Sequence, residues 1–240
     1  MAIDLLDKTA NANNLTNNGA SEWLTSTPFA APNTTAVSLV AAESDYLAAD
    51  DSASLSVTGD CSFECWVLRD SIGSFMTMVG KDGGSGSGQR SYRLAFLADN
   101  TIRWDTWSDG VESGASAAST GTITSTTVWH HVAITFTAST KVVLFYIDGA
   151  LDTTSSAQVS GVIFNGTNEM AIGRSAAGAS VQFDGKIDEV RIWGDVRSGA
   201  EITANYNIRL TGAETDLAAY YPFESLQASG SSGLQGKYWG

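Results

Sequence analysis

The stretch CSFECWV, residues 61–67, decides the fold class of this chain. Apolar and polar residues alternate along most of it, which is the period of a β-strand with one face in a core. The core face is expected to hold Cys61, Phe63, Cys65 and Val67. A strand places the two cysteines roughly 13 Å apart, farther than a disulfide can span, so we expect two free, buried thiols.

Segments with similar alternation lie on both sides of this stretch and extend the prediction to the whole chain. They occupy residues 37–40, 46–47, 55–57, 75–79, 92–97, 101–104, 128–136, 142–147, 170–172, 187–193 and 217–223. Asp148-Gly149, between residues 142–147 and Ala150-Leu151, suits a tight hairpin turn because both residues tolerate positive φ. This density of strands and turns predicts an all-β fold of two packed antiparallel sheets.

One helix is predicted among the strands, at about residues 199–210. Ser198 and Glu201 have the spacing of a capping box at its start. Apolar residues then recur at helical intervals as far as Leu210, and Gly212 follows as a stop signal. We expect this helix to lie on the sandwich rather than to form a second domain.

Composition limits the class of protein further. The chain has 240 residues, of which 43% are hydrophobic, and a formal net charge of −13. Such a charge disfavours nucleic acid as a partner, and no run approaches the roughly 20 apolar residues of a membrane span. We expect one domain over residues 1–226 and a Gly/Ser-rich tail over 227–240. Docking and a plain tail both stay open for Lys237–Gly240, and no secretory signal is visible at the start of the chain.

Four motifs follow one another in an order typical of a known family. They are WHHVAITF at 129–136, LFYIDG at 144–149, IGR at 172–174 and FDGKIDEVRIW at 183–193. The series resembles the laminin G-like, pentraxin-related domains of the concanavalin A-like lectin and glucanase superfamily, over about residues 4–225. The resemblance implies a jelly-roll sandwich that closes with the predicted helix and a final strand.

The resemblance also implies a structural Ca²⁺ site. Members of the family often hold the ion between an opening turn and an aspartate of a late strand, and the matching residues here are Asp7, Asn11, Asn13 and Asp188. Their oxygens are ligands of the kind that Ca²⁺ prefers. Two alanines replace the family's glycines in the turn, so a turn satisfied by its own hydrogen bonds is the alternative.

No catalytic constellation is evident in the sequence. Glucanases of this superfamily use two carboxylates, but the adjacent Asp188 and Glu189 should point to opposite faces of a strand. His130 and His131, the only histidines, lie inside a strand motif. A Gly-x-Ser-x-Gly nucleophile turn is also missing from the sequence. We therefore expect that the protein is not an enzyme.

A glycan-binding surface is predicted in a loop region around residues 103–109. Arg103, Trp104, Asp105, Trp107 and Asp109 combine flat rings, which stack on sugars, with groups that bind hydroxyls. The competing interpretation places both tryptophans in the core and at its rim.

These observations predict a non-catalytic recognition module, carbohydrate-binding or adhesive, on an extracellular or virion surface. Its partner would be a glycan or a surface protein, and homo-oligomer formation or virion assembly is compatible with either. The alternative is a structural decoration protein of a phage capsid or tail, which makes protein contacts without binding glycans. Release by lysis would then explain an opening segment without a secretory signal.

Overall fold

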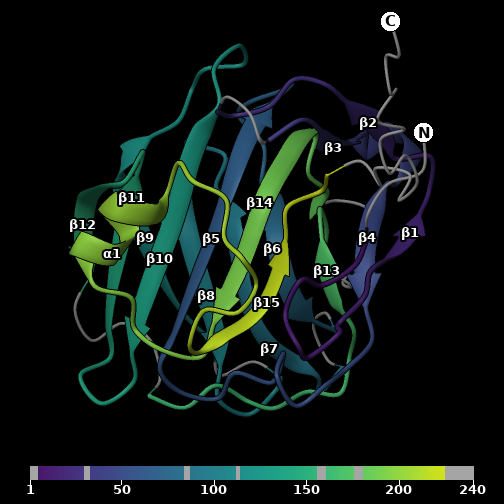
Figure 1. Ribbon diagram of the computed structural model, residues 1–240. Coiled ribbons are helices and arrows are strands. Elements are labelled where there is room, and N and C mark those ends of the chain that lie inside the picture. The colour runs from purple at the N-terminus through teal and green to yellow at the C-terminus, as the bar shows by residue number, and fades with distance from the viewer. Residues whose placement is uncertain are drawn as a thin grey trace, which may run out of the picture.

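Two antiparallel β-sheets packed face to face form the fold, as the alternation of the sequence predicts (Figure 1). The structure is a computed structural model that describes residues 5–29, 33–83, 87–111, 114–155, 161–175 and 181–224. The predicted tail, Lys237–Gly240 included, lies outside the described residues. Within them, no helix is long and apolar enough to cross a membrane.

The first sheet has seven strands in the order β1-β4-β13-β6-β7-β8-β9. The bounds are β1 Thr16–Asn18, β4 Tyr46–Ala49, β13 Met170–Ile172, β6 Met76–Asp82, β7 Arg90–Phe96, β8 Thr101–Trp107 and β9 Gly114–Thr122. Strands β6 to β9 are consecutive antiparallel neighbours, so their side chains on the outer face of the sheet lie side by side.

The second sheet has eight strands, seven of them in the order β12-β11-β10-β5-β14-β3-β2, with β15 paired to β14. The bounds are β12 Ala150–Ser155, β11 Val142–Ile147, β10 His130–Thr137, β5 Cys61–Arg69, β14 Gly185–Trp193, β3 Ala36–Leu39, β2 Glu22–Leu24 and β15 Leu217–Tyr221. A short 3-10 helix, η1, spans Ala41–Glu43. The predicted hairpin is confirmed, since Asp148 and Gly149 join β11 to β12 with φ of 52° and 76°.

The core between the sheets is built around the strand that opened the sequence analysis. All four residues predicted for the core face of β5 are at most 1% exposed, and both cysteines are free. Phe63 of β5 packs against Tyr92 and Trp104 from the opposite sheet, with both pairs of ring centroids 4.9 Å apart. Aromatic contacts of this kind join the two sheets at the centre of the sandwich.

Helix α1 spans Gly199–Asn205, shorter than the 199–210 predicted from the sequence. Its start is as expected, because Ser198 and Glu201 form a capping box. Its end is determined by a residue of the sheet. Arg191 of β14 donates to the backbone carbonyls of Asn205 and Ile208, at 2.9 Å for Asn205. Carbonyls held by side chains of the sheet favour a turn at this point over further helix.

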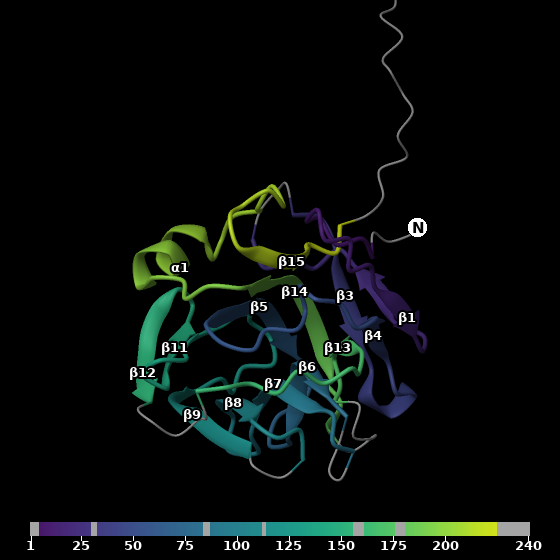
Figure 2. The same ribbon diagram turned by 90° about the horizontal axis from the view of Figure 1, so that it is seen from below.

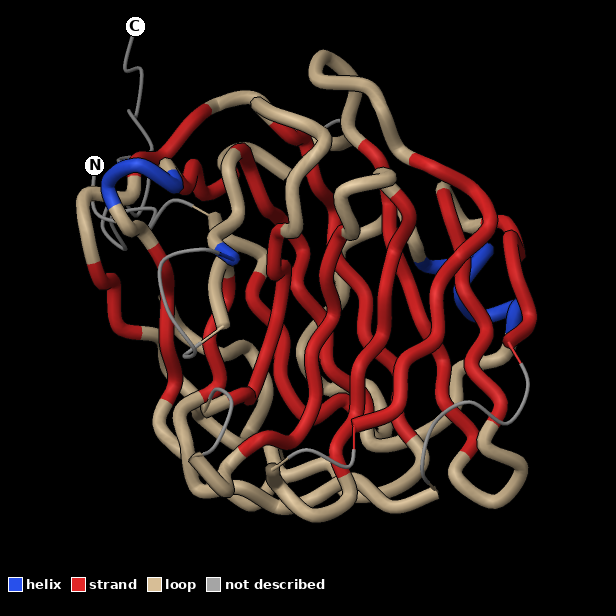
Figure 3. The backbone as a smooth tube through the Cα atoms, turned by 180° about the vertical axis from the view of Figure 1, so that it is seen from behind, coloured by secondary structure: helices blue, strands red, loops and turns tan. Residues whose placement is uncertain are grey.

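The two outer faces of the sandwich differ. Helix α1 and the segment that follows it lie on the outer side of the eight-stranded sheet, as the view along the sandwich shows, while β15 pairs with β14 within the sheet (Figure 2). Beneath α1 and this segment Glu64 accepts a hydrogen bond of 2.8 Å from the indole of Trp193, and Tyr220 donates to Glu189 at 2.7 Å. This cover explains why both faces of β5 are buried. Figure 3 shows the strands of the seven-stranded sheet from the other side, away from α1 and β15.

Candidate functional site

A chain of ion pairs crosses the outer face of the seven-stranded sheet from β6 to β8. Asp82 on β6 pairs with Arg90 at 2.9 Å and with Arg93 at 3.2 Å. Arg93 on β7 also pairs with Asp105 on β8 at 2.7 Å, and Arg103 pairs with the same carboxylate at 2.5 Å. We call Asp82, Arg90, Arg93, Arg103 and Asp105, with the rings of Phe75 and Trp107, the arginine platform.

Asp105 is the anchor of this platform. Its side chain is 1% exposed, and one carboxylate oxygen accepts two hydrogen bonds from Arg93, of 3.0 and 2.7 Å. The other oxygen accepts from Arg103 and from the hydroxyl of Ser116 on β9. Such charge-assisted hydrogen bonds fix the guanidinium groups in one orientation.

Two aromatic rings support the arginines. The Arg90 guanidinium lies 3.9 Å from the ring centroid of Trp107, and that of Arg93 lies 4.7 Å from the centroid of Phe75. Arg103 lies 6.0 Å from the same Phe75 ring. Trp107 is 4% exposed, whereas Phe75 is half-buried and presents part of its ring to solvent. The outer surface of the platform therefore consists of one accessible ring beside planar charged groups.

The structure corrects part of the predicted binding surface. Residues 103–107 belong to strand β8 rather than to a loop, and Trp104 is fully buried in the core, stacked near Tyr92. Alternation along the strand separates the other candidates from it, because Arg103, Asp105 and Trp107 share the outer face. Asp109 lies beyond the strand in an exposed turn, where its carboxylate accepts from the backbone of Val111 at 2.9 Å.

Sequence reasoning missed Phe75, Asp82, Arg90 and Arg93 as members of the platform. They lie on or beside β6 and β7, and only the pairing of those strands with β8 brings them to Asp105. The alternation along its strand predicts that Arg93 lies on the outer face, but the sequence of that strand does not predict which residues of other strands it contacts.

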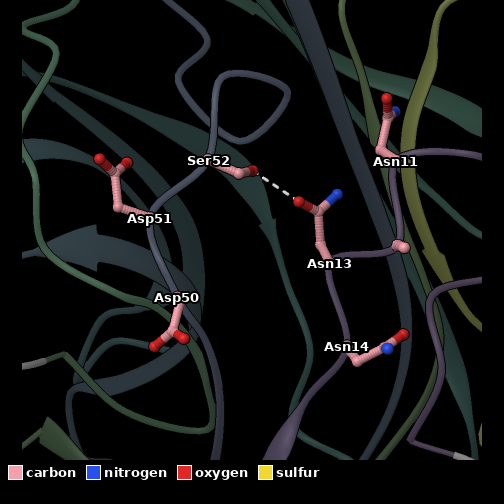
Figure 4. A pocket seen from close by; sticks show the side chains of 7 residues that line it. Asn11, Asn13, Asn14, Asp50, Asp51 and Ser52 are labelled. Carbon is pink, nitrogen blue, oxygen red and sulfur yellow. Dashed lines mark hydrogen bonds between the residues drawn. The ribbon is translucent and has the colours of Figure 1, made fainter.

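Two of the predicted calcium residues, Asn11 and Asn13, line a separate hollow of about 320 Å³ (Figure 4). Asn11 to Asn14 lie on one side of it and Asp50 to Ser52 on the other, and Ser52 donates to Asn13 at 2.5 Å. The antiparallel pairing of β1 with β4 places these two segments side by side. None of the described residues that line this hollow carries an aromatic ring.

Asp7 itself is buried behind the turn and saturated with hydrogen bonds. One carboxylate oxygen accepts from the backbone of Thr9 at 2.9 Å and of Tyr220 at 3.0 Å. The other accepts from the Thr9 hydroxyl and from the backbone and side chain of Asn13, at 2.9, 3.0 and 2.9 Å. All five partners are donors, so this arrangement fits the hydrogen-bonded turn, and an ion would have to replace them.

Asp188 has its hydrogen-bond partners elsewhere. Its carboxylate accepts from the side chain of Asn33 at 2.9 Å and from the backbone of Glu189 at 2.8 Å. Burial, reinforced by the charge of Glu189, raises the pKa of Asp188 well above its usual range. The side-chain oxygen of Asn33 is buried without a hydrogen-bond partner in the described structure.

Within the described residues, no group of three or more His, Cys, Asp or Glu side chains is placed to hold a metal ion. Since Asp7 and Asp188 each have their own hydrogen-bond partners, the donor set does not fit an ion shared between them as it stands. Calcium binding by Asp7, Asn11, Asn13 and Asp188 stays a prediction.

Solved structures with a similar fold include several glycan-binding domains. Domain 4 of AbnA, an extracellular arabinanase from Geobacillus stearothermophilus in complex with arabinotriose, matches with a TM-score of 0.63 at 18% identity over 85% of this chain and 93% of that one. The CBM40 of the Ruminococcus gnavus IT-sialidase, bound to α2,3 sialyllactose, matches with a TM-score of 0.55 at 16% identity over 65% and 86%.

A third similar structure is the binding domain of Paraclostridial Mosquitocidal Protein 1, with a TM-score of 0.62 and 14% identity over 85% of this chain. This chain spans about half of that one, 51%. At such identities the likeness shows the fold alone. A search of curated proteins found no match. A sequence model described as the concanavalin A-like lectin/glucanases superfamily matches residues 41–203, most of the chain, and this protein therefore belongs to that family.

Proposed function

We propose that this protein is a non-catalytic carbohydrate-binding module that holds a glycan on the arginine platform. The observation that carries the proposal is the half-buried ring of Phe75 beside the partly exposed guanidinium of Arg103, on a sheet face away from α1 and β15. A flat ring stacks on the C–H face of a sugar, and fixed planar donors bind its oxygens.

The similar structures support a glycan as the ligand. The arabinanase domain was solved with arabinotriose and the CBM40 with sialyllactose, so the fold accommodates sugars of different chemistry. The hollow at the opening turn is less suited to such a ligand, because its described lining residues are polar except for Ala12 and include no ring for stacking.

The electrostatics of the platform support the absence of catalysis. A glycosidase needs one carboxylate to protonate the leaving group and another to attack or to activate water. Asp82 and Asp105 are the carboxylates of the platform, and each is bound by two arginines. Carboxylates held in this way are positioned to orient guanidinium groups rather than to contact a scissile bond.

Affinity gel electrophoresis against a panel of soluble polysaccharides tests the proposal. Phe75→Ala should abolish retardation by the glycan that binds the wild type, because it removes the stacking surface. Leu151→Ala is the matched control, since Leu151 is 56% exposed on β12, in the other sheet. A protein retarded by no glycan, or a Phe75→Ala variant that binds normally, would refute the platform as the site.

The proposed placement is extracellular, as it is for the arabinanase whose domain resembles this chain. Decoration of a virion by protein contacts stays the alternative prediction. It would appear as copurification with particles in the absence of any glycan signal.

A further inference from the structure

We propose that the arginine platform selects an acidic glycan, one whose sugars carry carboxylate groups. This inference rests on the proposed function and adds the chemical class of the ligand. It starts from the charge of the platform, where three arginines face two aspartates. The whole chain has a net charge of −13, so this patch has the opposite sign to the molecule that carries it.

The excess charge is found at the two ends of the ion-pair chain. Arg93 in the middle is fully engaged, because Nε and Nη2 donate to Asp105 and Nη1 donates to Asp82. Arg103 donates through Nε to Asp105 and through Nη2 to Ser116, and Arg90 donates only through Nε, to Asp82. Within the described part of the chain this leaves Nη1 of Arg103 and both Nη groups of Arg90 without a hydrogen bond.

These unused donors belong to side chains that reach solvent. The side chain of Arg103 is 31% exposed and that of Arg90 is 13% exposed, against 1% for Asp105. A ligand at this surface can therefore reach them and supply the acceptors. A planar guanidinium with free donors is the group that binds a carboxylate most specifically.

The arginines are also held in place before any ligand arrives. Trp107 lies against Arg90 and Phe75 against Arg93, while the buried Asp105 fixes Arg93 and Arg103. A free arginine loses side-chain entropy when it binds, and here much of that loss has already occurred on folding. Phe75 beside them would contact the apolar face of the sugar ring whose carboxylate meets an arginine.

The test compares polymers whose carboxyl groups are either charged or methyl-esterified. Isothermal titration calorimetry would measure binding of the purified protein to polygalacturonate and to alginate, and to the fully methyl-esterified form of each. We expect binding to at least one acid form, at least tenfold tighter than to its ester. Arg103→Gln and Arg90→Gln should each weaken it by about tenfold or more.

Arg174→Gln is the matched control for these variants. Arg174 also pairs with a carboxylate, Glu169 at 3.1 Å, and lies 3.5 Å from the ring centroid of Tyr46, but it is outside the platform. The Arg174→Gln substitution should change the affinity for the acidic polymer less than twofold. Arg103→Lys keeps the charge without the planar donors and should still weaken binding, with melting temperatures checking that each variant folds.

Four results would overturn the inference. Equal affinity for an acid polymer and its ester would show that charge is not recognised, and an Arg174→Gln variant as weak as Arg103→Gln would show attraction by net charge only. Binding of neutral glycans alone, lost in Phe75→Ala, would leave the proposed function standing and refute the acidic ligand. Absence of binding to every glycan would refute both.

Discussion

Truncation of Trp107 distinguishes between the two roles that the sequence suggests for it, ligand stacking and packing in the fold. As a ligand-stacking residue it would be dispensable for stability, but the structure buries it to 4% exposure beneath Arg90. Removing a buried Trp side chain costs about 3–5 kcal/mol of unfolding free energy. For a domain of this size each kcal/mol lowers the melting temperature by about 2–4 °C, so Trp107→Ala should lower it by roughly 6–20 °C.

Thermal unfolding followed by circular dichroism measures this shift. Trp107→Phe keeps a ring under the guanidinium and should recover most of the lost stability. Trp129→Ala is the reference for a less buried tryptophan, whose indole donates to the Ser26 hydroxyl at 3.3 Å. This substitution should lower the melting temperature less than Trp107→Ala does. A Trp107→Ala variant that melts within about 2 °C of the wild type would contradict the buried position and restore the ligand-stacking role.

Three further predictions concern the opening turn and Asp188. The raised pKa of Asp188 means that its neutral form stabilises the fold, an effect present below about pH 3.9 and lost as pH rises towards the folded pKa. In urea titrations Asp188→Asn should therefore match the wild type near pH 3 and become the more stable protein towards pH 7. If Ca²⁺ binds at Asp7 and Asp188, millimolar Ca²⁺ should raise the melting temperature above that in EDTA, and Asp188→Asn should lose the rise; equal melting temperatures would reject the site. Ala12 has φ of 54°, so Ala12→Gly should stabilise the protein by about 1 kcal/mol, and a destabilised variant would show that the turn does not hold this strain.

Strands with large side chains were predictable because their alternation is visible locally. The β5 face and the 142–147 strand follow from it directly. Strand β9, GASAASTGT, was not predicted, since small residues give no clear apolar face. Its pairing with β8 defines it as a strand.

The residue at which α1 ends and the residues that form the arginine platform could not be predicted from local sequence patterns, for a similar reason. The helix ends where Arg191, several residues earlier on β14, takes the carbonyls of Asn205 and Ile208. In the platform, Arg103 and Asp105 could be placed on one face from the sequence, but Arg93 meets Asp105 only through the register of β7 with β8. Both outcomes depend on which strands become neighbours, and that is settled by packing of the whole sandwich.

The two outer faces of the sandwich show the same kind of side chains put to different use. Beneath α1 and the segment that follows it, Arg191 is 1% exposed and its Nη groups donate to Glu189 and to two backbone carbonyls. That arginine ties a covering segment to the sheet. On the outer face of the seven-stranded sheet, Arg103 and Arg90 pair with the carboxylates beneath them, and some of their N–H donors have no hydrogen bond within the described part of the chain. Burying a charged group without a partner is costly, but the side chains of Arg103 and Arg90 reach solvent, so solvent or a ligand can supply acceptors for their unused donors. The difference between these arginines is thus the difference between a structural ion pair and a surface that can receive an anion.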